Sequence, residues 1–227
     1  MGSLEKKIGK IITIDGTDRT GKHTQATLLH ERLKRESYKT ALLDFPQYQS
    51  LSGEMVKEYL QGCYGSKEQL GAKLPSLLYA VNRFNEKEKL VNWLNNGYIV
   101  VLDRYMESNM TYQSAKLPQK ERPAFLQWLE TLEFGIFELP RSDLVIYLHV
   151  PTEISKQLEE KESKETGKQA DIHENDGEFQ KRVMEQYLTL AGERNWKVIE
   201  CVDKGNILPY VTIAESIWKV VLPYLTK

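Results

Sequence analysis

The stretch that decides the fold reads Gly16-Thr17-Asp18-Arg19-Thr20-Gly21-Lys22. It lies between the β-branched run Ile11-Ile12-Thr13-Ile14 and a helical pattern through Leu28, Leu29 and Leu33. Glycines at this spacing between a strand and a helix are typical of a P-loop, whose backbone N–H groups turn inward toward phosphate. The N-terminus of the following helix adds partial positive charge. The stretch therefore predicts a phosphate cradle, and the alternative is a chance glycine turn before a helix.

Two cations of this loop are candidates for phosphoryl transfer. Lys22 would bridge the β- and γ-phosphates of ATP as a compact charge. Arg19 would act as an arginine finger inside the loop and offset charge that develops in the transition state. The alternative for Arg19 is an ion pair with a surface carboxylate. The predicted ATP-binding residues are Gly16, Thr17, Asp18, Arg19, Thr20, Gly21, Lys22, His23 and Thr24.

The residue after the P-loop lysine departs from the usual pattern. A Ser or Thr hydroxyl normally helps to hold magnesium there, and this chain has His23. Thr24 follows one residue later, about 100° further around the helix, so it does not simply replace that ligand. We expect Mg²⁺ to be held mainly by phosphates, water and Asp103. Neutral His23 would touch a metal-bound water at most.

The bulk composition narrows the class of protein. The chain has 227 residues, 41% of them hydrophobic and 28% charged, which is enough for the core of one α/β domain spanning residues 1–227. A formal net charge of -1 provides no field for nucleic acid or an acidic membrane. Cys63 and Cys201 are too few for a disulfide framework. No run of 18 apolar residues and no signal sequence are present, so we expect a cytoplasmic protein.

Alternating strands and helices predict an α/β fold. Apolar runs predict a five-stranded parallel sheet covered by helices on both faces, whose ligands gather at the carboxyl ends of the strands. The Lys- and Glu-rich segment from Glu153 to Asp176 predicts a helical lid, and a charged surface helix pair is the alternative. A final helix is expected from Ile207 to Leu225. The five predicted strands are Ile11 to Ile14, Thr40 to Phe45, Tyr98 to Leu102, Asp143 to Val150 and Lys197 to Cys201.

A second motif follows the third predicted strand. Val100-Val101-Leu102 ends in Asp103-Arg104-Tyr105. A carboxylate at this strand end would organise magnesium beside the P-loop. Arg104 carries a bidentate fork that suits a second phosphate, that of the acceptor. The two residues could instead form a local ion pair, and the dipeptide alone leaves both readings open.

Taken in order, the motifs resemble the thymidylate kinase family of nucleoside monophosphate kinases over nearly the whole chain. The matching segments are Gly16 to Gln25, Phe45-Pro46, Leu77 to Arg83, Asp103-Arg104-Tyr105 and Glu174-Asn175 with the helix from Phe179. The family implies in-line transfer from ATP to a deoxynucleoside monophosphate, most simply dTMP, and it suggests a homodimer. Arg19 in the loop, and a lid with Lys156, Lys161, Lys164 and Lys168 but no arginine, resemble the family class with a P-loop arginine.

The resemblance also implies roles on the acceptor side. Asp18 would receive the deoxyribose 3′-hydroxyl, Tyr79 would stack on the pyrimidine, and Arg83 would bond a base carbonyl. An aromatic face and a planar donor four residues later share one side of a helix, although Tyr79 could also be ordinary core. Arg104 would clamp the acceptor phosphate. The predicted acceptor-binding residues are Asp18, Phe45, Tyr48, Tyr79, Arg83, Arg104, Tyr112 and Gln113.

Two residues depart from the family pattern and keep the acceptor open. Tyr48 stands where many relatives have an arginine that reaches the acceptor phosphate, and Glu107 brings negative charge toward the acceptor pocket where an aromatic residue is common. One alternative is therefore a kinase of another deoxynucleotide or of an unphosphorylated deoxynucleoside. Another is a nucleotide-binding switch without transfer activity, which His23 favours and the second phosphate clamp, Arg104, opposes.

Overall fold

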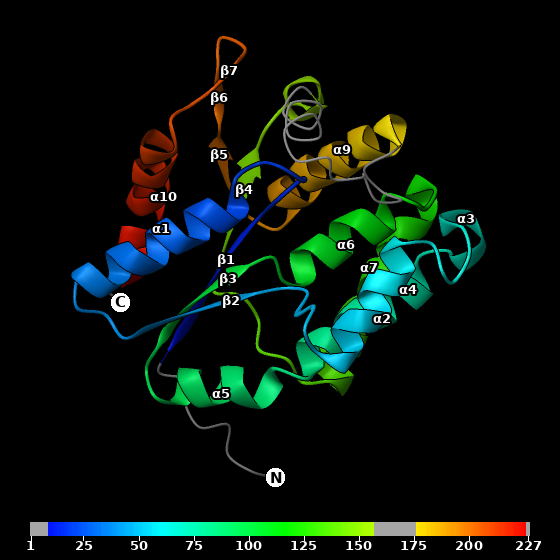
Figure 1. Cartoon of the computed structure of the whole chain (residues 1–227), viewed down its shortest axis with the longest axis horizontal. Helices are drawn as coiled ribbons and strands as arrows, with labels where there is room; N and C mark the ends of the chain where they lie inside the picture. Colours follow the sequence, from blue (N-terminus) through cyan, green and yellow to red (C-terminus); the bar gives the residue numbers. More distant parts are fainter. Residues whose placement is uncertain (1–8, 157–175, 226–227) are drawn as a thin grey trace.

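A parallel five-stranded sheet with the strand order β2-β3-β1-β4-β5 forms the centre of the protein (Figure 1). The structure is a computed structural model, and it describes residues 9–156 and 176–225. The prediction of five parallel strands is confirmed, and each strand end lies within two residues of its predicted position. The strands are β1 (Lys10–Gly16), β2 (Thr40–Asp44), β3 (Ile99–Asp103), β4 (Leu144–His149) and β5 (Lys197–Glu200).

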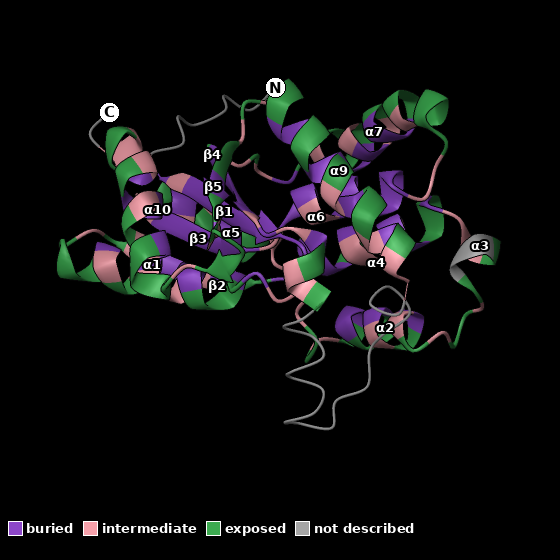
Figure 2. Cartoon of the chain, turned by 90° about the horizontal axis from the view of Figure 1, so that it is seen from above, coloured by how far each residue is buried: buried purple, intermediate pink, exposed green. Residues whose placement is uncertain are grey.

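Helices cover both faces of the sheet, as predicted. On one face lie α1 (Lys22–Arg35) and α10 (Tyr210–Leu225), and on the other α5 (Lys87–Asn95), α6 (Met106–Ser114) and α9 (Gly177–Glu193). Figure 2 shows buried strands between helices whose outer faces are exposed. Further helical segments are α2 (Leu51–Leu60), α3 (Lys67–Leu70), α4 (Lys73–Phe84), η1 (Gln119–Glu121), α7 (Arg122–Glu130) and the π-helical η2 (Thr131–Ile136).

Side chains alternate along β1 between two hydrophobic clusters. Ile11 packs in the cluster that includes α5 and α6, while Ile12 and Ile14 pack in the cluster with α1 and α10. Strand residues point to opposite faces with a period of two, so a fully buried strand needs apolar residues on both faces. The run is accordingly apolar except for Thr13, which is buried with its Oγ1 2.8 Å from Ser142 Oγ.

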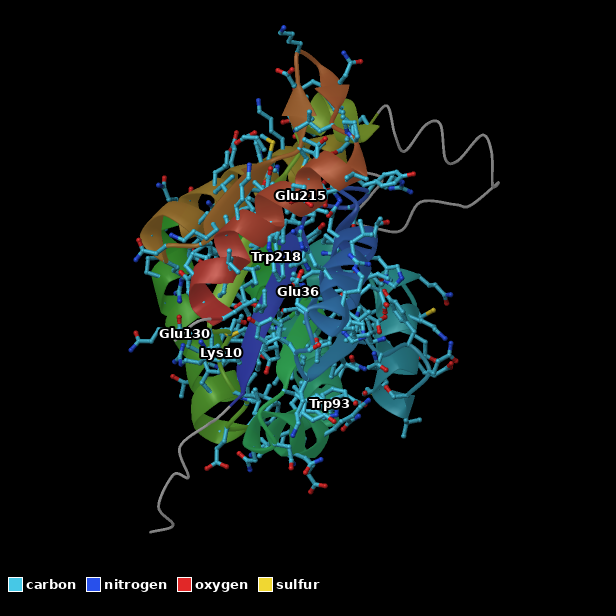
Figure 3. The ribbon with its side chains drawn as sticks, turned by 90° about the vertical axis from the view of Figure 1, so that its left-hand side faces the viewer. Lys10, Glu36, Trp93, Glu130, Glu215 and Trp218 are labelled. Atoms are coloured by element: carbon cyan, nitrogen blue, oxygen red, sulfur yellow. The ribbon has the colours of Figure 1, made fainter. Side chains whose placement is uncertain are left out.

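The last helix packs back on the sheet, as its apolar pattern predicts. Ile213, Ile217 and Val221 are buried against the sheet and α1. At the contact with α1, Arg32 donates to Glu215 Oε1 at 2.6 Å and its guanidinium lies 4.3 Å from the Trp218 ring. Figure 3 shows Glu215 and Trp218 on α10. These contacts tie α10 to the helix that follows the P-loop.

The sequence-based start of the last helix, Ile207, is wrong by three residues. A short hairpin, β6 (Val202–Asp203) and β7 (Asn206–Ile207), precedes the helix. Its turn places Lys204 at φ 48° and Gly205 at φ 80°. Lysine is not a usual turn residue at positive φ, so the sequence carries no strong hairpin signal.

The lid prediction is only partly testable, because residues 157–175 lie outside the described part of the chain. The helix predicted from Phe179 is confirmed as α9, and the Asp176 side chain caps it by accepting from Phe179 N at 3.0 Å. Cys63 and Cys201 are both unpaired, as predicted. None of the helices in residues 9–156 and 176–225 is long and apolar enough to cross a membrane.

Candidate active site

The P-loop wraps tightly around the end of β1. A Cβ atom on Gly16 would lie 2.8 Å from both the Leu148 carbonyl oxygen and Thr20 Oγ1, so only glycine fits there. Gly21, directly before α1, has φ 79°, which glycine adopts without strain. Arg19 also takes a left-handed backbone, with φ 59°. Non-glycine residues with a left-handed backbone conformation occur most often at ligand-binding and active-site loops.

Lys22 lies inside the loop and is buried. Its Nζ donates to the Thr17 carbonyl oxygen at 2.5 Å. Burial, followed by the charge of Arg104, lowers the pKa of Lys22 to about 8. The carboxylates of Asp18, Asp103 and Asp15 act against this fall in pKa. A desolvated ammonium is further stabilised by an anion, such as a phosphate bound in the loop.

Asp103 and His23 meet at the edge of the loop. His23 Nδ1 lies 3.3 Å from Asp103 Oδ2, and the His23 side chain is exposed. Burial raises the pKa of Asp103, and nearby Lys22 and Arg104 act against that rise. Thr24 is exposed one position further along α1. Within the described residues no group of three or more His, Cys, Asp or Glu side chains is placed to hold a metal ion.

Arg104 follows Asp103 but turns toward the P-loop. It adopts φ 64°, and its Nη2 donates to Asp18 Oδ1. Its Nη1 donates to Ser108 Oγ at 3.1 Å and to the Gly16 carbonyl oxygen at 3.3 Å. The Asp103-Arg104 dipeptide left open whether the two residues form a local ion pair. In the structure Arg104 pairs with Asp18 of the P-loop and not with Asp103.

A cavity of about 90 Å³ opens beside Arg104. All eight acceptor-side residues predicted from the sequence line it, which confirms that they come together. Asp18 in its wall also accepts from Tyr112 OH at 2.8 Å, so both carboxylate oxygens are engaged. The lining residues are Asp18, Phe45, Pro46, Tyr48, Leu60, Tyr79, Asn82, Arg83, Arg104, Tyr105, Ser108, Asn109, Tyr112 and Gln113.

An aromatic side chain and a buried arginine on α4 form one wall of the cavity. Tyr79 is half-buried and meets Tyr59 edge to face at a centroid distance of 6.2 Å. It therefore presents surface to the cavity and is not fully enclosed core. Arg83, four residues later, has a side chain that is only 3% exposed. Its Nε donates to Glu133 Oε2 at 2.7 Å, and its Nη2 donates to the other oxygen of the same carboxylate.

Sequence reasoning did not assign several residues of this region to the acceptor site. Asn82, Ser108 and Asn109 line the cavity, and Glu133 stands behind it. The helical spacing of four residues from Ser108 to Tyr112, and from Asn109 to Gln113, is a signal that could have indicated two of them. Glu133 had no such signal, because η2 reaches Arg83 only through the tertiary packing.

A second, smaller hollow adjoins the P-loop on its other side. It has a volume of about 20 Å³ and is lined by Thr17, Asp18, Arg19, Thr152, Ser155, Lys156 and Gln180. Asp18 is thus common to both hollows. A ligand in the first hollow and one at the P-loop would meet at Asp18 and Arg104.

The expectation that Glu107 brings its charge to the acceptor pocket is wrong. Glu107 is buried and faces away from the cavity, with its Oε1 accepting from Ser142 Oγ at 2.9 Å. Burial raises its pKa to about 7. Glu107 is the second residue of α6, and the helical turn carries its side chain toward Ser142, just before β4.

Comparison with known proteins gives a consistent family assignment. The family model described as "Thymidylate kinase" matches residues 14–206. The chain is 30% identical over 201 residues to the thymidylate kinase of Arabidopsis thaliana, covering 88% of this chain and 68% of that protein. It is 29% identical over 204 residues to the thymidylate kinase of Mycobacterium tuberculosis H37Rv, covering 87% and 94%. The solved thymidylate kinase from Candida albicans matches with a TM-score of 0.70 over 95% of this chain and 92% of that chain; at 24% identity this shows a shared fold.

Proposed function

The chain belongs to the thymidylate kinase family, and from this premise we propose that it transfers the terminal phosphoryl group of ATP to dTMP, forming dTDP. One structural observation supports this proposal independently of the family assignment. Asp18 and its partner Arg104 lie at the junction of the P-loop and the cavity that holds Tyr79 and Arg83. A donor phosphate at the loop and an acceptor phosphate at Arg104 would therefore meet, as in-line transfer requires.

The donor side depends on three groups of this chain. The P-loop N–H groups and the α1 N-terminus would bind the donor phosphates, with Lys22 as the central cation. Arg19, at its left-handed position in the loop, would offset charge on the transferring group. No covalent nucleophile is needed, because positioning and charge neutralisation supply most of the catalysis.

The acceptor side fits a nucleotide that carries its own phosphate. Arg104 offers the fork for that phosphate, and Asp18 offers oxygens for the sugar hydroxyl once its bonds to Arg104 and Tyr112 rearrange. Tyr48 lines the cavity as a neutral hydroxyl where many relatives would supply a second cation. Arg104 therefore bears most of the phosphate recognition in this chain, which favours dTMP over unphosphorylated thymidine.

The residues beside the P-loop fit a magnesium ion that binds together with the nucleotide. Mg²⁺ keeps several waters and binds through one or two carboxylates together with substrate phosphates. Asp103 is the carboxylate at the carboxyl end of β3, and His23 beside it lies within reach of a metal-bound water. The bound ion would neutralise charge between the β- and γ-phosphates. Asp103 would orient its water shell.

The remaining proposals concern organisation. We assign residues 1–227 to one kinase domain with a lid insertion at about 153–176, whose closure would exclude water. The two unpaired cysteines suit a reducing, cytoplasmic compartment. Exposed apolar side chains on the neighbouring helices α2 and α4 support a homodimer, because such patches mark interfaces. They are Leu51, Met55, Leu74, Val81 and Phe84.

The test is a kinetic screen of acceptors. ADP formation is measured with ATP, Mg²⁺ and each of dTMP, dUMP, dCMP, dGMP and thymidine. The proposal predicts the highest kcat/KM for dTMP and little turnover of thymidine. A higher kcat/KM for another acceptor would reassign the substrate and keep the chemistry. Tight ATP binding without ADP formation from any acceptor would make the protein a nucleotide-binding switch and overturn the proposal.

A further inference from the structure

A buried carboxylate behind the acceptor cavity has no role in the phosphoryl transfer. Glu133 comes from η2, the π-helical continuation of α7, and is fully buried. π-helical turns inside or after α-helices often occur at functional sites, because the extra residue redirects a side chain. A charge in the interior is costly unless it is paired, and an apolar group of equal size would often stabilise a core as well. Packing alone therefore does not explain why a carboxylate occupies this buried position.

Glu133 joins two residues that line the acceptor cavity. It takes two hydrogen bonds from Arg83 on α4, and its Oε1 also accepts from Asn109 Nδ2 on α6 at 3.1 Å. Arg83 and Asn109 both line the cavity, whereas Glu133 does not. One carboxylate thus holds both polar side chains from behind.

This arrangement determines how the Asn109 amide is turned. Its Nδ2 donates to Glu133 and also to the Ser76 carbonyl oxygen at 3.1 Å. Both partners can only accept, so the amide nitrogen must face them and the amide oxygen must face elsewhere. Asn109 Oδ1 is buried and has no hydrogen-bond partner among the described residues. An orphaned acceptor in a cavity wall is a group left for a ligand donor.

Arg83 supplies the complementary donor. Glu133 takes its Nε and Nη2, and its Nη1 makes only a long contact of 3.4 Å with the Tyr105 carbonyl oxygen. The cavity wall therefore offers a donor from Arg83 beside an acceptor from Asn109. This pair complements a base edge with a carbonyl at C4 next to N3–H, as in thymine and uracil. Cytosine presents the opposite edge, an amino group next to an unprotonated N3.

We infer that Glu133 is a positioning residue that sets base choice by holding Arg83 and Asn109 in the orientation that reads a C4 carbonyl beside N3–H and rejects cytosine. The inference rests on the proposed function, since it concerns the base of the acceptor nucleotide. Glu133 acts through Asn109: without the carboxylate, the Ser76 carbonyl oxygen is the one remaining acceptor described for the amide nitrogen, so turning that nitrogen toward cytosine N3 costs less. A buried polar group left without a partner costs about 1–3 kcal/mol, which is the source of the discrimination.

The experiment compares kcat/KM for dTMP, dUMP and dCMP in the wild type and in Glu133→Gln. The variant should lower the dTMP/dCMP ratio at least about 10-fold, the equivalent of about 1.4 kcal/mol. The dTMP/dUMP ratio should stay constant, because both bases present the same edge. The matched control is Glu130→Gln, one turn earlier, whose carboxylate pairs with Arg194 and Arg141 outside the cavity. It should leave both ratios unchanged.

A purely structural role for Glu133 gives a different result. Activity with dTMP and dCMP would then fall in parallel and their ratio would stay at the wild-type value, which overturns the inference. Asn109→Ala should lower the same ratio, and adding Glu133→Gln to it should change the ratio no further. If Glu133→Gln does not fold by circular dichroism, Asn109→Ala decides, and an unchanged ratio with that variant overturns the inference.

The two proposals fail separately in this design. A wild-type protein that phosphorylates no nucleoside monophosphate removes the proposed function. A wild-type protein that phosphorylates dTMP and dCMP equally well keeps the kinase and removes the role of Glu133.

Discussion

Replacing Arg104 by lysine tests the junction of the two substrate sites. The guanidinium is held from three sides, by Asp18, by Ser108 Oγ at 3.1 Å and by the Gly16 carbonyl oxygen at 3.3 Å, and it lies 5.7 Å from the Tyr112 ring centroid. Lysine keeps the charge but has a single nitrogen, so it cannot hold these partners and also present two parallel N–H groups to a phosphate.

The size of the effect follows from the bonds that are lost. A hydrogen bond to a charged group contributes about 1.5–3 kcal/mol, and the substitution removes at least one such bond to the acceptor phosphate. A loss of about 2 kcal/mol corresponds to about a 30-fold fall in kcat/KM for dTMP. Tyr48 is the neighbouring cavity residue and carries no charge, so it cannot compensate. The binding of ATP, whose phosphates lie at Lys22, should change much less.

The assay is steady-state kinetics with dTMP varied at saturating ATP, together with calorimetric titration of ATP in the absence of acceptor. Arg32→Lys is the matched control, because Arg32 is an ion-paired arginine on α1 at the contact with α10. It should retain wild-type kcat/KM. The assignment of Arg104 to the acceptor phosphate is refuted if Arg104→Lys leaves kcat/KM for dTMP unchanged, or if it weakens ATP binding as strongly as dTMP use.

Three further predictions concern the loop, its lysine and the surface. Arg19→Ala should lower kcat about 1,000-fold with little change in ATP affinity, as expected for an arginine finger; single-turnover kinetics with unchanged kcat would remove Arg19 from the chemistry. Folding lowers the pKa of Lys22 from 10.5 to about 8, so its burial destabilises the nucleotide-free protein below pH 8 and this penalty fades as pH rises toward 10.5. The unfolding free energy of the wild type minus that of Lys22→Met, from urea melts, should therefore rise across that window, and a flat difference would contradict the burial. Leu51, on α2, is 85% exposed, and Leu51→Glu together with Val81→Glu should convert the proposed dimer to a monomer in light scattering; a wild-type monomer would rule the dimer out.

Much of the fold could be read from the sequence because the strands are fully buried. The runs at Ile11 to Ile14 and Val100 to Leu102 place apolar side chains on both faces of the sheet, each of which is covered by helices. The glycine pattern from Gly16 to Gly21 then identified the connection from the first strand to the first helix. The hairpin at residues 202–207 was missed because its turn uses Lys204 at positive φ, which local sequence preferences do not indicate.

On the acceptor side, the sequence predicted only those site residues that the family resemblance indicates. The family resemblance selected the eight predicted residues, with Tyr48 as a departure from the family pattern, and all eight line the cavity. Glu107 was misplaced because a helical residue points in the direction that its turn dictates, and sequence neighbours of a site residue need not face the site.

The sequence by itself determined the parallel sheet, the phosphate loop and the identity of its cations, because short-range patterns of glycine, charge and burial carry that information. The tertiary structure alone decided the partners of those groups. Arg104 bonds to Asp18, which is 86 residues away, and Arg83 bonds to Glu133, which is 50 residues away. Such pairs are selected by the packing of whole helices and by the cost of leaving a buried charge unpaired, and neither is visible in a local stretch of chain. The P-loop from Gly16 to Lys22 is therefore determined by the sequence, while its connection to the acceptor cavity is determined by the fold.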